Sequence, residues 1–211
     1  MPFRSNPARR NCKLHRSSAG FLAVLLGLSC LALLARGEPV MILDPRFYHT
    51  PISLPVAGSS RTVIGFYDEA NDGTVTPISA DSLAQHPLPE LKSRALAHAR
   101  TLLQHVTPKI SRDKHGVAID VRVESNDPSL SSIVLIPGFI DQFANVVGKD
   151  CVVSIPNRQV IFFFPRIGGD LQELTYALRS FYHNNAWPVS TELFEWRNGG
   201  LVATRDLEST Q

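Results

Sequence analysis

Apolar residues recur with two different periods between residues 61 and 106, and each period predicts a different element. Residues 61–67, Arg-Thr-Val-Ile-Gly-Phe-Tyr, are rich in β-branched and aromatic side chains and predict a strand. The turn signal Asn71-Asp72-Gly73 follows, so residues 74–78 are expected to return as the partner strand. From Pro89 onwards, apolar residues recur every three or four positions and predict a helix over 89–106, which Pro108 ends.

The second half of the chain continues this mixture of strands and helices. The strongest signals are the Asn198-Gly199 turn of a terminal hairpin and a helix that Asp170 would cap after Gly168-Gly169. Residues 109–117 are charged and predict a loop. The other predicted elements are a strand at 117–123, two short helices within 130–147 separated at Pro137-Gly138, a hairpin of apolar strands at 151–155 and 159–164, and the hairpin strands 193–197 and 200–204.

Paired strands outnumber β-α-β alternations in this order, which favours one particular fold class. We expect a single α+β domain over residues 61–207, with helices packed on a mostly antiparallel sheet. Residues 38–60 contain several prolines and glycines with little periodicity and predict a linker. Residues 208–211 would be a tail.

The N-terminal 37 residues have the composition of a targeting segment. Residues 1–18 are polar and basic, and residues 19–35 form an uncharged apolar run. Small residues at Ala35 and Gly37 predict a secretory signal that is cleaved before Glu38. The alternative is an uncleaved N-terminal anchor helix, because the run is nearly long enough to span a bilayer. The domain would then be periplasmic or secreted, or held at the inner membrane outside the cytoplasm.

Charge and cysteine content support this division of the chain. The chain has 21 Lys and Arg against 19 Asp and Glu, yet six of the basic residues and none of the acidic ones lie in residues 1–37. The remaining body is mildly acidic, so we expect no nucleic-acid partner. Cys12 and Cys30 lie in the leader, which leaves Cys151 alone in the body. Its apolar neighbours predict a core residue rather than a nucleophile.

No motif in the sequence assigns a reaction. Phosphate-binding glycine patterns and the G-x-S-x-G elbow of a serine nucleophile are missing, so we expect no cofactor and the catalytic residues remain unknown. No group of His, Cys, Asp and Glu residues has metal-ligand spacing, so we also expect no metal. Turns between strands and helices meet at the edges of sheets, which makes their polar residues the ones to follow. These residues are Asp127, Ser131, Asp150 and Arg158.

The order of segments from Arg61 to Leu207 resembles the YtpQ family, a bacterial domain of unknown function. The resemblance is carried by residues 63–68 (Val-Ile-Gly-Phe-Tyr-Asp), 95–103, 131–139, 148–158 (Gly-Lys-Asp-Cys-Val-Val-Ser-Ile-Pro-Asn-Arg) and 188–196. At the end of the first helix, His98 and Arg100-Thr101-Leu102 depart from the family's usual Asn-Leu. The resemblance implies no activity and supplies no catalytic residues.

Two functions from different classes follow from these observations. The first is an exported or membrane-tethered, non-catalytic binding or interaction module, with a protein among the possible partners and with membrane contact only through the N-terminal segment. The second is a cell-envelope hydrolase with acid and base groups near Asp127, Asp150 and Arg158. A pocket where these side chains converge would favour the enzyme, and their dispersal would favour the binding module.

Overall fold

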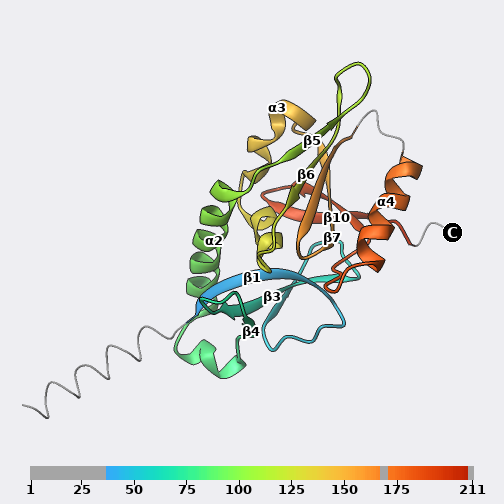
Figure 1. The fold of residues 1–211 in the computed structure, drawn as a ribbon. Coiled ribbons are helices and arrows are strands. Elements are labelled where there is room, and N and C mark those ends of the chain that lie inside the picture. The colour runs from blue at the N-terminus through green and yellow to red at the C-terminus, as the bar shows by residue number, and fades with distance from the viewer. Residues whose placement is uncertain (1–36, 167–170, 209–211) are drawn as a thin grey trace, which may run out of the picture. The chain divides into compact units, whose positions relative to one another are not determined.

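Two antiparallel sheets with their covering helices form the body of the chain in the computed structural model, which describes residues 37–166 and 171–208 (Figure 1). The α+β class is confirmed, with two sheets where one was expected. The predicted leader and the predicted cap at Gly168-Gly169-Asp170 lie outside the described residues.

The smaller sheet is built around β3 (Thr62–Glu69). The long strand β1 (Glu38–Pro45) pairs along one side of β3, from Glu38 opposite Glu69 to Pro45 opposite Thr62. The short strands β2 (Ser53–Pro55) and β4 (Val75–Pro77) share the other side.

The predicted linker at 38–60 is therefore wrong, because it contains a core strand. Val40, Met41, Ile42 and Leu43 of β1 are at most 1% exposed. A strand buried on both faces shows a continuous apolar run without alternation. Here the apolar run is short and flanked by Pro39 and Pro45, so the hydrophobic pattern did not predict a strand.

The larger sheet has the strand order β10-β9-β7-β8-β6-β5. Its strands are β5 (Lys109–Arg112), β6 (Ala118–Glu124), β7 (Cys151–Asn157), β8 (Val160–Pro165), β9 (Glu192–Arg197) and β10 (Gly200–Asp206). Ile161 and Phe163 of β8 face one core, whereas Phe162 and Phe164 face another. The apolar hairpin, which was predicted, is thus buried on both faces. Strand β5, predicted as part of a loop, is a fully exposed edge strand.

Helix α2 (Leu88–His105) connects the cores of the two sheets. Its Leu91 and Ala95 pack with Met41 and Phe66 of the smaller sheet, and its Ala99 and Leu103 join the core of the larger sheet. The short helices η2 (Leu130–Leu135), η3 (Phe139–Gln142) and α3 (Ala144–Val147) complete this core, and η1 (Ala80–Ala84) precedes α2.

Helix α4 (Leu171–His183) covers the opposite face of the larger sheet, where its Leu178 packs with Phe162 and Phe164 (Figure 1). None of the described helices has the length and apolar content that crossing a lipid bilayer requires.

The turn predicted at Asn198-Gly199 for the terminal hairpin is confirmed. Asn198 and Gly199, between β9 and β10, have φ angles of 53° and 76°. Positive φ at both central residues is the requirement of a type I′ turn, which matches the twist of the two strands it joins.

Candidate functional site

A buried ion pair lies where the two sheets meet. Asp44 is near the end of β1, and Arg158 follows β7 in the turn to β8. Nε and Nη2 of Arg158 donate to Oδ1 of Asp44 at 2.9 and 2.5 Å, and the Tyr67 hydroxyl donates to Oδ2. Asp44 is 0% and Arg158 5% exposed. Burial raises the pKa of Asp44, while Arg158 and Tyr67 oppose that rise by stabilising the carboxylate.

Local features of β3 allow Tyr67 to reach Asp44. Gly65 and Tyr67 are two positions apart in the strand and so share one face of the sheet. A Cβ on Gly65 would lie 2.8 Å from Cε2 of Tyr67 and 3.0 Å from Oδ2 of Asp44. Because glycine has no Cβ, the tyrosine ring can pass over it, and its hydroxyl meets the carboxylate.

Three aromatic rings surround the guanidinium group of Arg158. Its Cζ lies 5.2 Å from the ring centre of Trp187, 5.5 Å from that of Tyr67 and 5.6 Å from that of Tyr48. These distances are within the range of cation–π attraction. Trp187 and Tyr48 are 48% and 45% exposed, so two of the rings also face solvent. We call Arg158 and these three rings the arginine cage.

Main-chain contacts hold Trp187 against the arginine cage. The Arg158 N–H donates to the carbonyl oxygen of Trp187 at 3.1 Å. Asn157 and Pro188 form an isolated β-bridge, and Nδ2 of Asn157 donates to the carbonyl of Phe181 at 3.2 Å. The loop after α4 is therefore attached to the turn that carries Arg158.

Arg158 also lines a cavity of about 330 Å³, which we call the Arg158 cavity. The described residues that line it are Gly73, Thr74, Val75, Asn126, Pro128, Arg158, Gln159 and Trp187. Arg158 alone among them carries a charge. Its Nη1 donates to none of the described residues, whereas Nε and Nη2 are both used by Asp44. Nη1 of this guanidinium is thus left to bind what enters the cavity.

A second polar cluster includes a residue that is next to the cavity lining in the chain. Asp127, between the lining residues Asn126 and Pro128, accepts hydrogen bonds from the N–H and hydroxyl of Ser129 at 2.8 and 2.7 Å. Ser129 Oγ lies 3.4 Å from Nε2 of His98. Nδ1 of His98 lies 2.9 Å from Glu38, and Nε2 lies 3.4 Å from Glu69. Burial, and then Asp127, raise the pKa of Glu69, which His98 opposes.

The order serine, histidine and acid in this cluster is that of a nucleophilic triad, but the serine is not available for attack. Ser129 is 0% exposed, and its hydroxyl donates to Asp127 instead of to the histidine. A triad needs an accessible serine oxygen whose proton the histidine takes. In the described part of the chain, no group of three or more His, Cys, Asp or Glu side chains is arranged to hold a metal ion.

The four polar residues singled out from the sequence separate into two pairs. Arg158 lines the cavity, and Asp127 lies in the chain between its lining residues Asn126 and Pro128. Ser131 and Asp150 lie elsewhere. Ser131 is buried and accepts a hydrogen bond from the Leu43 N–H at 3.0 Å. Asp150 is exposed just before β7, and Arg158 directly follows that strand, so about 26 Å of extended chain separates the two.

Sequence patterns missed Asp44, Tyr48, Tyr67 and Trp187. The one signal available was Asp44 itself, a carboxylate directly after the apolar run of β1. Nothing near it in the sequence reveals a partner, because Arg158 is 114 positions away.

Cys151 is a core residue, as expected. It is 2% exposed, and burial raises the pKa of its thiol to about 11. A thiol with so high a pKa is a poor nucleophile at neutral pH, because little of it is thiolate.

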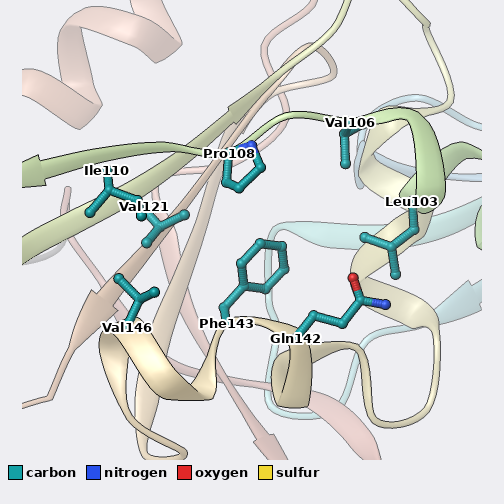
Figure 2. A pocket seen from close by; sticks show the side chains of 8 residues that line it. All are labelled: Leu103, Val106, Pro108, Ile110, Val121, Gln142, Phe143 and Val146. Atoms are coloured by element: carbon teal, nitrogen blue, oxygen red, sulfur yellow. The ribbon is translucent and has the colours of Figure 1, made fainter.

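A smaller cavity of about 150 Å³ lies between the end of α2, strand β5 and the η3–α3 segment. Figure 2 shows Phe143 rising into it beneath Pro108, with Leu103 and Val146 on either side. Gln142 is the one lining residue with a polar side chain among those described. This cavity offers packing surface and no reactive group.

No protein-family profile, curated protein or solved structure matches the chain.

Proposed function

We propose that this protein is an exported or membrane-tethered binding module and that the Arg158 cavity is its ligand site. One observation carries the proposal: a guanidinium that is 5% exposed keeps Nη1 free of partners in the described structure and lines a cavity. An N–H donor of a residue that lines a cavity, when no described protein group accepts from it, is available to a ligand in that cavity.

The exposed aromatic residues near Arg158 support binding as the role of this surface. Phe47 is 66% exposed and lies 5.9 Å from Tyr48 between ring centres, next to the arginine cage. Exposed Trp, Tyr and Arg side chains are the residue types that dominate the energetics of protein interfaces. Phe47 contacts Tyr48, and Tyr48 and Trp187 both contact Arg158.

The hydrolase alternative has weaker support. Its proposed acid and base groups do not converge, since Asp150 lies at the far end of β7 from Arg158. Arg158 is occupied by Asp44, and Ser129 is enclosed. Membership of the YtpQ family remains a prediction that rests on the quoted segments alone.

Site-specific photo-crosslinking tests the binding proposal. A benzophenone amino acid at position 187 should yield specific adducts when the full-length chain is expressed with its leader. The same residue at Val117, which is 62% exposed on the β5–β6 turn, is the matched control. Adducts from position 187 but not from position 117 support the proposal. Equal yields at both positions, or none at position 187, contradict it.

Fractionation and N-terminal sequencing test the location. A first residue of Glu38 in the envelope supports a cleaved signal, and an intact leader in the membrane fraction supports an anchor. Full-length protein confined to the cytosol contradicts export.

A further inference from the structure

We propose that the Arg158 cavity binds a carboxylate joined to an apolar or aromatic group, with the acid on Nη1 of Arg158 and the apolar group against Trp187. This inference rests on the proposed function and adds the chemical class of the ligand.

The argument for a carboxylate starts from the state of Arg158. Nη1 carries two N–H groups, and no described residue accepts from them. Nε and Nη2 are already used, so the ligand would accept from the two N–H groups of Nη1 alone. A buried guanidinium forms its strongest hydrogen bonds with an ionised acceptor, and a neutral carbonyl accepts more weakly from the same N–H groups.

The charges around the cavity favour a single negative charge on the ligand. Asp44 already compensates Arg158, so the buried pair has no net charge. No other described residue that lines the cavity is cationic, so a carboxylate adds one net negative charge to the site, whereas a phosphate dianion would add two at a higher cost of burial. Asp127, between the lining residues Asn126 and Pro128, accepts with Oδ1 from the N–H and hydroxyl of Ser129.

The rest of the cavity wall suits an apolar body. Trp187 is 48% exposed and supplies a flat ring, and Val75 and Pro128 supply aliphatic surface. Asn126 and Gln159 add neutral amides that can donate to or accept from a polar substituent. A volume of about 330 Å³ is at the small end of ligand sites, which limits the buried group to about one aromatic side chain.

This chemistry has two sources: the C-terminus of a peptide or a free aromatic acid. Calorimetric titration of the full-length chain in a mild detergent distinguishes them. The probes are N-acetyl-phenylalanine, which mimics a peptide C-terminus, phenylacetate as the free acid, and N-acetyl-phenylalaninamide, which lacks the charge. We expect at least one acid to bind ten times or more tightly than the amide, and the tighter of the two acids identifies the source.

Variants connect the binding to the proposed residues. Arg158→Lys keeps the charge but loses the N–H groups of Nη1, so the preferred acid should bind at least tenfold more weakly. Arg197→Lys makes the same change at an exposed arginine that pairs with Glu195 and should leave binding unchanged. Circular dichroism checks the fold. If Arg158→Lys does not fold, Trp187→Ala replaces it as the test variant. Trp187→Ala should lower the affinity for the preferred acid about fivefold.

The outcomes separate the ligand class from the proposed function. Equal affinity for acid and amide, no binding of either acid at millimolar concentration, or unchanged affinity in a folded Arg158→Lys variant overturns the carboxylate assignment. Specific crosslinks from position 187 would still support a binding module in each case. Loss of those crosslinks would instead refute the proposed function.

Discussion

Replacing Arg158 by methionine tests whether the buried ion pair is as strongly coupled as its geometry indicates. Methionine fills a similar volume but leaves Asp44 0% exposed, with Tyr67 as its remaining side-chain partner. Two unit charges about 4 Å apart attract each other by about 4 kcal/mol at an effective dielectric constant of 20. Removing one partner of a buried pair typically costs about 3–5 kcal/mol. We therefore expect Arg158→Met to lower the free energy of unfolding by about 3–5 kcal/mol.

Urea unfolding followed by circular dichroism measures this loss, and two further variants make the result specific. Arg197→Met removes an exposed arginine that pairs with Glu195, and we expect a cost of at most about 1 kcal/mol. The double variant Asp44→Asn/Arg158→Met removes both buried charges, so it should be more stable than Arg158→Met alone. The reasoning is refuted if Arg158→Met and Arg197→Met cost the same, or if the double variant recovers no stability.

Three other predictions follow from the same structure. Cys151 should stay unmodified by maleimide at pH 7 in the folded chain and react in urea, because it is buried and the pKa of its thiol is about 11. Peptide mass mapping measures the labelling, and equal labelling in both states would contradict this. Burial raises the pKa of Glu69 from 4.5, so folding favours the protonated side chain, and this stabilisation is lost as the pH rises through the raised pKa. Glu69→Gln cannot ionise, so its free energy of unfolding should rise relative to that of the wild type between pH 4 and 7. A difference between the two proteins that does not change with pH would count against this. Gly65→Ala should cost about 1–3 kcal/mol in urea unfolding through crowding of Tyr67 and Asp44, whereas Gly200→Ala, with open space at its Cβ, should cost less; similar losses would argue against the close approach.

Sequence patterns predicted those elements whose turn or hydrophobic repeat lies within the segment itself. The β7–β8 and β9–β10 hairpins and helix α2 were recognised because a turn or a repeat of three and four residues lies within each segment. Strand β5 was missed for the opposite reason. It contains Lys109 and Arg112 and is exposed along its length, so only pairing with β6 makes it a strand.

The candidate site could be predicted only in part, because its contacts join distant segments. Asp127 and Arg158 were recognised as turn residues that would lie at a sheet edge. Their neighbours depend on the packing of one sheet against another: Asp44 belongs to β1 and Trp187 to the loop after α4. Tyr67 was placed in a strand correctly, but its role depends on Gly65 leaving room for its ring.

The position of the ion pair argues for a role beyond holding the sheets together. A buried pair of charges can often be replaced by apolar residues with little loss or some gain of stability, so packing alone does not require Asp44 and Arg158 at this junction. An apolar replacement could not offer an N–H edge to the Arg158 cavity. The double variant Asp44→Asn/Arg158→Met separates these roles: we expect it to fold and to lose at least tenfold in affinity for the preferred carboxylate probe. If it folds and binds that acid as wild type does, the ion pair serves the fold alone.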